Sequence, residues 1–157
     1  MKIKTLLELS SAENISDKVL MYGHKEGMHP LTVAVLDVGG NPIVIKRQDG
    51  SGIMRVDIAV GKAWGALGMG VPTRLLRDRL ADRPAFQNAL AVASGGRFVP
   101  VPGGVLICDA MSEVIGSVGV SGDTSDKDEY CAIEAIRSVG FQPNPDLPSS
   151  TWRDSKL

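Results

Sequence analysis

The chain has 157 residues, of which 43% are apolar and 22% are charged, a length and composition typical of one globular domain and not of a disordered chain. The formal net charge at pH 7 is -1, which argues against the general basic surface of a nucleic-acid-binding protein. We therefore expect a small-molecule ligand or a protein partner, and no nucleic acid.

The first half of the chain predicts a helix, a β-hairpin and a second helix. Apolar residues recur every three or four positions over residues 11–26, as on the buried face of an amphipathic helix. Two runs rich in β-branched residues, 31–37 and 42–48, are joined by a Gly-Gly-Asn turn at 39–41, which is the pattern of a hairpin. Helical spacing returns over residues 53–67, and glycines then end this helix.

The second half predicts two short helices, a second hairpin and a last helix. Prolines open short helical stretches at 73–80 and 86–93. The prolines of GRFVPVPGG at 96–104 exclude a central strand there. VLICD and EVIGSVGVSG then flank a polar turn and predict a hairpin. The last helix begins at SDKDEYCA, where Ser125 and Asp128 have the spacing of a capping box.

This order of elements predicts an α+β domain, in which helices pack on the faces of an antiparallel sheet of four or five strands. We expect a single domain over residues 1–141. The remaining sequence, QPNPDLPSSTWRDSKL, is too rich in proline and serine for a helix or a strand. Residues 142–157 are therefore predicted to form an extended tail over the body or over a neighbouring subunit.

Nothing in the chain predicts a membrane segment or an oxidising compartment. No apolar run approaches the roughly 20 residues that a membrane-spanning helix needs, and MKIKTLLELSSAEN lacks the long apolar core of a signal peptide. Cys108 and Cys131 are too few for a disulfide framework and lack the CxxC spacing of a metal site. We predict reduced thiols, a cytoplasmic location and no membrane contact.

Short motifs occur along the chain in an order that is typical of a known family. They are AVLDVGG at 34–40, KRQDG at 46–50, DIAVGKA at 57–63, PVPGGV at 100–105, IGSVGVSG at 115–122 and the SDKDEYCA helix start. With these motifs the chain resembles the GlcG/HbpS family of haem-binding-protein-like domains, also seen as the C-terminal domain of PduO-type cobalamin adenosyltransferases. The resemblance implies a profilin-like three-layer α/β/α fold and a homo-oligomer, from a dimer to an octamer.

The resemblance also implies a small-ligand-binding protein, with haem or a related tetrapyrrole as the named ligand and small-acid or aromatic catabolism as the setting. Two positions depart from the family pattern, because a frequent histidine is Asn41 and a frequent proline is Leu106. The first departure removes one candidate haem ligand. His24, Tyr22 or a methionine could still bind haem iron, and the spacing selects none of them. We expect no site for a bare metal ion.

We predict one ligand pocket between the glycine-rich hairpin and the second helix. Cationic side chains could hold an anionic ligand there, and backbone N–H groups of glycines could receive a carboxylate or a phosphate. Two alternatives stay open: the glycines serve only tight turns, and the charged residues form an internal network that touches no ligand. The predicted ligand-binding residues are Arg47, Lys62, Gly103, Gly104, Gly122 and Asp128.

The alternative function is an enzyme: a metal-independent isomerase, tautomerase or hydrolase that acts on a small carboxylate or an aromatic ring-cleavage metabolite. Its candidate catalytic residues are Asp37, Asp49 and Lys62, which would move a proton or bind the carboxylate. No nucleophile elbow, Walker loop or dinucleotide fingerprint is present. The sequence leaves open whether the protein is an enzyme, and a third hypothesis is an accessory protein whose tail docks on a partner through Trp152.

Two residues of the last helix have competing interpretations. Asp128 lies in the first turn, where a carboxylate stabilises the helix dipole, so helix capping is an alternative to ligand binding. Cys131 follows one turn later. We expect it to be a buried apolar residue, although the positive end of the helix could instead lower its pKa and make it a nucleophile.

Overall fold

A computed structural model describes residues 4–157, and within them the chain forms five α-helices, one short 3-10 helix and one five-stranded sheet. The helices are α1 (Leu9–Lys25), α2 (Arg55–Met69), α3 (Thr73–Leu80), α4 (Pro84–Ala93) and α5 (Ser125–Ser138). The strands are β1 (Thr32–Asp37), β2 (Pro42–Arg47), β3 (Gly104–Cys108), β4 (Val114–Ser121) and β5 (Gln142–Asn144). Neighbouring strands are antiparallel, in the order β2-β1-β4-β3-β5.

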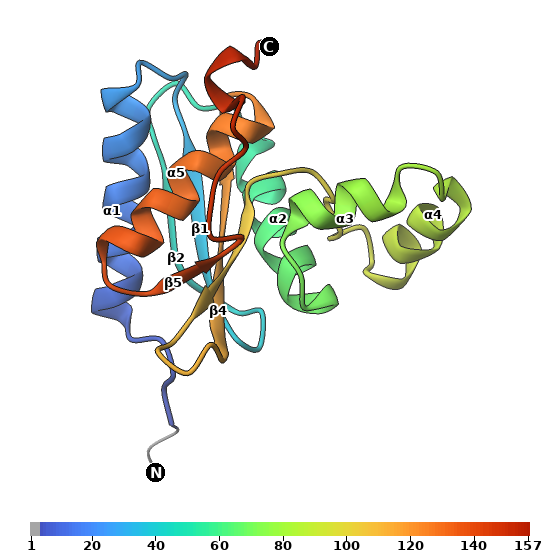
Figure 1. Ribbon diagram of the computed structural model, residues 1–157, viewed down its shortest axis with the longest axis horizontal. Helices are drawn as coiled ribbons and strands as arrows, with labels where there is room; N and C mark the ends of the chain where they lie inside the picture. The colour runs from blue at the N-terminus through green and yellow to red at the C-terminus, as the bar shows by residue number, and fades with distance from the viewer. Residues whose placement is uncertain (1–3) are drawn as a thin grey trace.

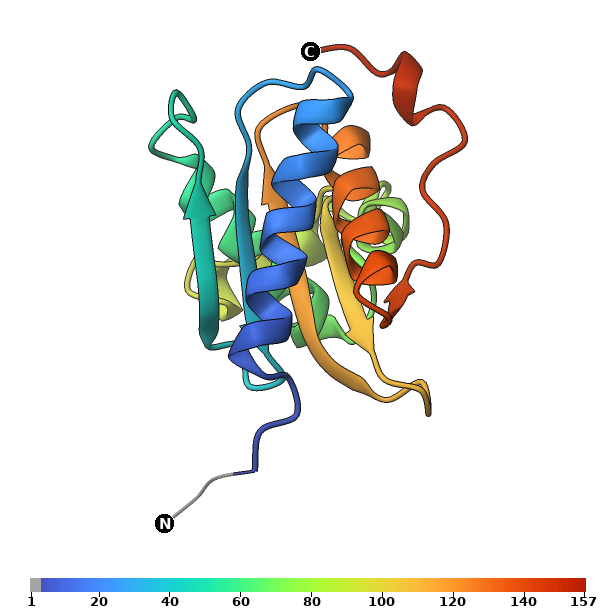
Figure 2. The same cartoon turned by 90° about the vertical axis from the view of Figure 1, so that its left-hand side faces the viewer.

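Helices cover both faces of the sheet and give three layers. The α1 and α5 helices lie side by side on one face, and α2 covers the other (Figures 1 and 2). The α3 and α4 helices form an arm that projects away from the sheet beyond α2 (Figure 1). This arrangement confirms the predicted α+β class and the three-layer α/β/α order. Among residues 4–157, no helix combines the length and the apolar character that crossing a bilayer requires.

The main core lies between the sheet and the layer formed by α1 and α5. Because side chains alternate along a strand, every second residue of the central strands faces this layer. The apolar stripes of the two helices meet these residues, as their 3.6-residue period requires. Buried side chains of this core include Ile15, Val19, Leu31, Val33, Val35, Ile107, Val118, Val120, Ile133 and Ile136.

The α2 helix packs on the other face of the sheet by direct backbone contact. A Cβ at Gly119 would lie 1.8 Å from the Ala59 carbonyl oxygen, and a Cβ at Gly104 would lie 2.3 Å from the Lys62 carbonyl oxygen. Any side chain at either glycine would overlap the helix backbone. These two glycines therefore allow α2 to approach closely, and they bring Lys62 against the ends of β3 and β4.

The start of α5 differs from the sequence prediction. Its N-cap is Thr124, whose hydroxyl accepts the Lys127 N–H at 3.4 Å, so Ser125 is the first helical residue and not the cap. The carboxylate of Asp128 accepts the N–H of Asp123, which precedes the cap. The predicted capping box is wrong by one residue, because Thr124 is also a favoured N-cap residue and the sequence motif does not distinguish it from Ser125.

The C-terminal segment is more regular than the sequence suggests. Residues Gln142–Asn144 form β5, which pairs with β3 at the edge of the sheet, and Trp152–Asp154 form a 3-10 helix. An edge strand tolerates proline because one side of it lacks a neighbouring strand. The following residues, 145–157, are called the tail below. The tail lies over α5 of its own chain, where the Trp152 ring stacks on Tyr130 with 3.7 Å between ring centroids.

Candidate functional site

The predicted site residues lie at three separate places in the fold. One end of the sheet is marked by the pairing of Thr32 with Arg47, and the other by the pairing of Asp37 with Gly116. Arg47 and Asp37 are therefore at opposite ends. The residues that the structure brings together between α2 and the start of α5 are Lys62, Gly103, Gly104, Gly122 and Asp128. The predicted gathering of all these residues around one pocket is not found within residues 4–157.

Lys62 and Asp128 form a buried ion pair. Lys62 Nζ lies 2.8 Å from Asp128 Oδ2 and donates to the Val120 carbonyl at 2.9 Å. The two side chains are only 2% and 1% exposed. Burial raises the pKa of Asp128 to about 6, although Lys62 and the Asp123 N–H act in the opposite direction. Both charges are engaged by internal partners, as a structural network requires.

The nearby glycines lie against protein atoms. A Cβ at Gly103 would lie 2.9 Å from Lys62 Nζ, and its φ of +116° is a conformation that other residues rarely adopt. The N–H of Gly104 donates to Thr73 Oγ1 at 2.8 Å. A Cβ at Gly122 would lie 2.5 Å from the Pro30 carbonyl oxygen. These contacts favour a packing role for the three glycines, and their anion-binding role stays a prediction.

An open hollow of about 510 Å³ lies at the C-terminal end of α1. Its lining residues are His24, Met28, Pro30, Arg47, Gln48 and Asp49. The hollow thus combines an imidazole, a thioether, a guanidinium and a carboxylate. Of the predicted site residues, Arg47 and Asp49 belong to it. The Arg47 guanidinium donates to the Ser51 carbonyl, which fixes one of its edges and leaves the guanidinium on the wall of the hollow.

Local backbone geometry brings His24 and Met28 into this hollow. The α1 helix ends at Lys25, Gly27 after its C-cap has a φ of +65°, and the Met28 N–H donates back to the Gly23 carbonyl at 2.9 Å. This is a Schellman turn, and it places Met28 beside the last helical turn, which contains His24. The sequence pointed to His24 as one of several iron ligands but did not select it. The turn at Gly27, together with the four-residue spacing, was the available signal.

The far end of the sheet holds Asp37 in a turn. Asp37 Oδ1 accepts the Asn41 backbone N–H at 2.9 Å and contacts the Asn41 side-chain amide at 3.2 Å. Gly40, with a φ of +79°, packs against Trp64 of α2. A hollow of about 150 Å³ lies between this turn and α2. Asp37 therefore stabilises the hairpin turn, as an aspartate in this position commonly does.

Cys131 is buried in the core, as expected. Its exposed fraction is 0%, and burial raises the pKa of its thiol above the ordinary range. The alternative of a nucleophilic thiol with a lowered pKa is wrong, because burial and the nearby carboxylates, Asp128 first among them, all raise the pKa of the thiol. Its Sγ lies 3.5 Å from the Met28 sulfur. Among residues 4–157, no three His, Cys, Asp or Glu side chains gather in a way that could hold a metal ion.

A sequence profile of the family described as "Haem degrading protein HbpS-like" matches residues 7–137 of this chain. The chain belongs to the HbpS-like family. Solved structures with low sequence identity to this HbpS-like chain have a similar fold. A double mutant of HbpS from Streptomyces reticuli is 29% identical, with a TM-score of 0.74 over 89% of this chain and 91% of that chain. Protein ORFY of Klebsiella pneumoniae is 26% identical, with a TM-score of 0.76 over 88% and 93%.

Two further proteins extend the comparison with this HbpS-like chain. PduOC in complex with haem shares the fold, with a TM-score of 0.77 at 23% identity over 86% of this chain and 96% of that chain. An uncharacterized 15.0 kDa protein in the dhaT-dhaS intergenic region of Citrobacter freundii is 30% identical over 107 residues, which are 68% of this chain and 74% of that protein. The family match ends at residue 137, so β5 and the tail lie beyond it.

Proposed function

We propose that this HbpS-like protein binds haem or a related tetrapyrrole in the hollow at the end of α1. The observation that carries the proposal is the joint presence of His24, Met28 and Arg47 on the wall of one hollow. Histidine is a common axial ligand of haem iron, and a guanidinium suits a carboxylate such as a haem propionate. The family description and the haem complex of PduOC support the same ligand class.

The residues present fit this group in size and in chemistry. The hollow of about 510 Å³ falls within the roughly 300–1,000 Å³ of most ligand sites. His24 is exposed on the last turn of α1 and is the candidate axial ligand, whereas Met28 is half-buried and its sulfur lies against the buried Cys131. Haem would supply an iron centre for redox or oxygen chemistry, whereas this chain would supply binding and orientation.

Binding is a better proposal than metal-independent catalysis. An acid–base enzyme needs its proton-transferring group within hydrogen-bond reach of the substrate. Lys62 and Asp128 are enclosed and mutually paired, and Asp37 is held in a turn at the other end of the sheet. Asp49 alone of the candidate acids lines the large hollow. The enzyme alternative therefore lacks a convergent set of groups.

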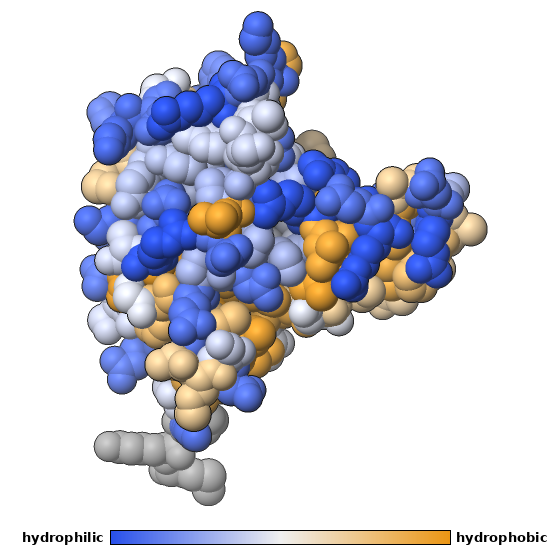
Figure 3. All heavy atoms as spheres, in the orientation of Figure 1, coloured by the Kyte–Doolittle hydropathy of each residue, from blue (hydrophilic) through white to orange (hydrophobic). Residues whose placement is uncertain are grey.

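We also propose that the protein is a homo-oligomer in which the α3–α4 arm contacts a second copy. Every residue of α4, PAFQNALAVA, is exposed or half-buried, and the helix carries no charge. Val92 is 81% exposed. In Figure 3, apolar surface continues from the body onto the base and lower edge of the arm. Exposed apolar patches of this kind mark interaction sites, and an uncharged helix can face its own copy without repulsion.

The two free, buried thiols fit a reducing compartment. We therefore propose a cytoplasmic location for the protein, as its two isolated cysteines predict. Cell fractionation with an antibody against the native protein tests this location.

Titration with haemin, followed by the Soret band, tests the proposed site. We expect one saturable site in the native protein. His24→Ala should weaken binding by about tenfold or more, which is about 1.4 kcal/mol, because it removes a candidate axial ligand. His29→Ala, which changes the other histidine, is the matched control and should bind as the native protein does. A Soret shift that survives unchanged in both His24→Ala and Arg47→Ala would contradict the proposal.

A further inference from the structure

Glu129 of α5 is a buried carboxylate that the proposed haem site does not use. Its exposed fraction is 0%. Neither Oε1 nor Oε2 has a hydrogen-bond partner within residues 4–157. An ionised carboxylate in this state is costly, because it has lost water and gained few compensating contacts. Such a group is expected to respond to anything that readmits water.

One cation compensates Glu129 directly. Arg74 Nη1 of α3 lies 3.3 Å from Glu129 Oε2. The Lys62 ammonium of α2 is paired with Asp128. The charged groups that face Glu129 from the elements around it are Arg74 and Arg77 on α3, Asp126 on α5 and Lys62 on α2.

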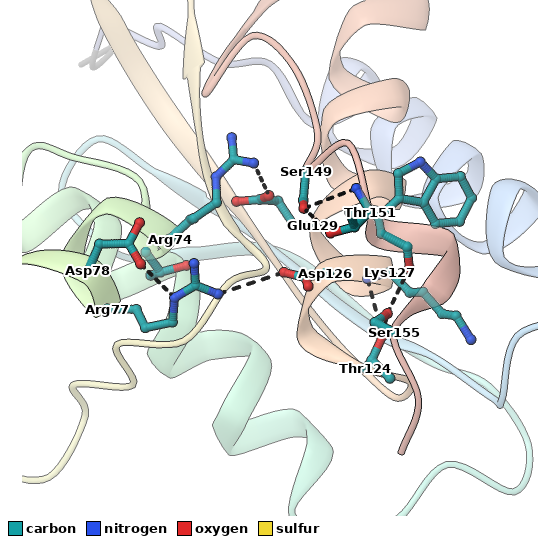
Figure 4. Close-up of polar contacts among 12 residues, drawn as sticks. Arg74, Arg77, Asp78, Thr124, Asp126, Lys127, Glu129, Ser149, Thr151 and Ser155 are labelled. Carbon is teal, nitrogen blue, oxygen red and sulfur yellow. Dashed lines mark hydrogen bonds and ion pairs between the residues drawn. The ribbon is translucent and has the colours of Figure 1, made fainter. Parts of the chain in front are cut away.

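Arg74 also holds the tail. Its Nη2 donates to the Leu147 carbonyl at 2.8 Å, so one guanidinium joins the buried carboxylate to the tail. In the view of Figure 4, Arg74 reaches Glu129 from α3, and Ser149 and Thr151 of the tail are drawn on the other side of the carboxylate. Further along, Ser155 Oγ lies 2.5 Å from the Thr124 hydroxyl at the start of α5.

We propose that the tail is a strap over Glu129, and that the strap closes when this carboxyl takes up a proton and loosens when it ionises. A closed strap keeps water from the carboxyl, which favours its neutral form. An open strap lets water hydrate the anion. Because the two positions of the strap favour different protonation states, proton binding and closure are linked. The strap thereby controls access to the surface shared by α3 and α5.

The proposed opening of the strap changes most steeply near neutral pH. In the closed molecule, burial raises the pKa of Glu129 from 4.5 to about 7, even though Arg74 acts to lower it. With the ordinary pKa restored in the open strap, linkage makes the opening equilibrium constant about tenfold larger at pH 8 than at pH 6. A simple ion pair that ties the tail would respond in the opposite direction, tightening as Glu129 ionises.

Acrylamide quenching of Trp152 fluorescence measures the opening of the strap. The chain has two tryptophans, so a Trp64→Phe background isolates Trp152. In this background we expect the opening equilibrium to grow by about tenfold from pH 6 to pH 8. Adding Glu129→Gln, which stays neutral, should keep the strap closed at both pH values. Adding Glu113→Gln, which changes an exposed carboxylate in the turn between β3 and β4, should leave the parent response unchanged.

Two results would overturn the proposal. The proposal fails if the strap tightens toward pH 8, or if it is already open at pH 6 in Glu129→Gln. Either result would mean that the Arg74–Glu129 ion pair simply holds the tail in place. A pH response that persists in Glu129→Gln would assign it to another group, such as Asp128, the pKa of which burial raises to about 6.

A second measurement does not depend on the folding of Glu129→Gln. Carboxyl ¹³C NMR titrates Glu129 directly in the full chain. Trp152→Ala removes the stacking on Tyr130 and should therefore lower the titration midpoint of Glu129, because linkage is reciprocal. An unchanged midpoint in a folded Trp152→Ala protein would equally overturn the proposal.

Discussion

Lys62 and Asp128 illustrate how a charged residue can be essential to the fold without contacting a ligand. Each charge is nearly inaccessible, and each has a second partner in the backbone, at Val120 and Asp123. Removing one member of a buried ion pair leaves the other charge buried without a partner. Replacing both members with apolar groups also removes the cost of desolvating the two charges. The pair joins α2 to α5 at the end of the sheet.

A double-mutant cycle on this pair tests its structural role. Lys62→Met should destabilise the protein by about 3–5 kcal/mol, because it leaves Asp128 buried without a cation. Lys62→Met combined with Asp128→Leu should recover most of this loss, which is a strongly non-additive result. Urea unfolding at pH 7 measures the free energies. Additive costs would mean that the two side chains do not depend on each other.

The close contact of α2 with the sheet depends on glycines in β3 and β4. Gly104 and Gly119 leave room for the helix backbone itself, and the packing on this face uses small residues in place of interlocking large ones. The sheet then places Lys62 and Thr73 against the start of β3. A shift of α2 would therefore disturb both the buried ion pair and the base of the α3–α4 arm.

Gly119→Ala tests this packing. Its Cβ would overlap the Ala59 carbonyl, and α2 must move to accept it, so we expect a loss of about 3 kcal/mol or more in the free energy of unfolding. Gly52→Ala is the control, because its Cβ has only Arg55 as a neighbour, at 3.9 Å. Chemical denaturation compares the two variants. Equal denaturation midpoints for Gly119→Ala and Gly52→Ala would show that the packing of α2 does not depend on a glycine at position 119.

Periodicity predicts the helices and the two hairpins well, since each element carries its own pattern of apolar residues. The β5 strand escapes prediction because Pro143 reads as a strand breaker, and only its position at an edge makes it acceptable. The site is less predictable. Arg47 and Asp49 share the hollow with His24 because α1 packs beside β2 in the folded chain, and side-chain type alone does not predict such convergence.

At the scale of the molecule, the α3–α4 arm stands apart from the three layers (Figure 1). Its tip helix, α4, is apolar in sequence and yet buries little against its own chain. In a monomer, such an uncharged projecting helix leaves apolar surface exposed to water. In an oligomer, a subunit contact buries this surface.

Val92→Asp tests the proposed assembly. A carboxylate at this exposed position should break the subunit contact, since it would be desolvated without a partner, and should lower the mass in solution toward 16.6 kDa. Val38→Asp, at another exposed apolar site at the far end of the sheet, is the control. Light scattering coupled to size-exclusion chromatography gives both masses. A native protein that is already monomeric would refute the assembly.

Mapping the ligand onto the fold is the most direct test of the central claim, that the hollow at the end of α1 holds haem. Amide NMR spectra recorded with haemin and with a diamagnetic gallium protoporphyrin separate broadening by the iron from other effects. We predict that iron-dependent broadening centres on residues 23–30 and 47–49, on both sides of the hollow. Broadening centred on the Gly39–Gly40 turn or on the α3–α4 arm, with residues 23–30 unaffected, would contradict the account.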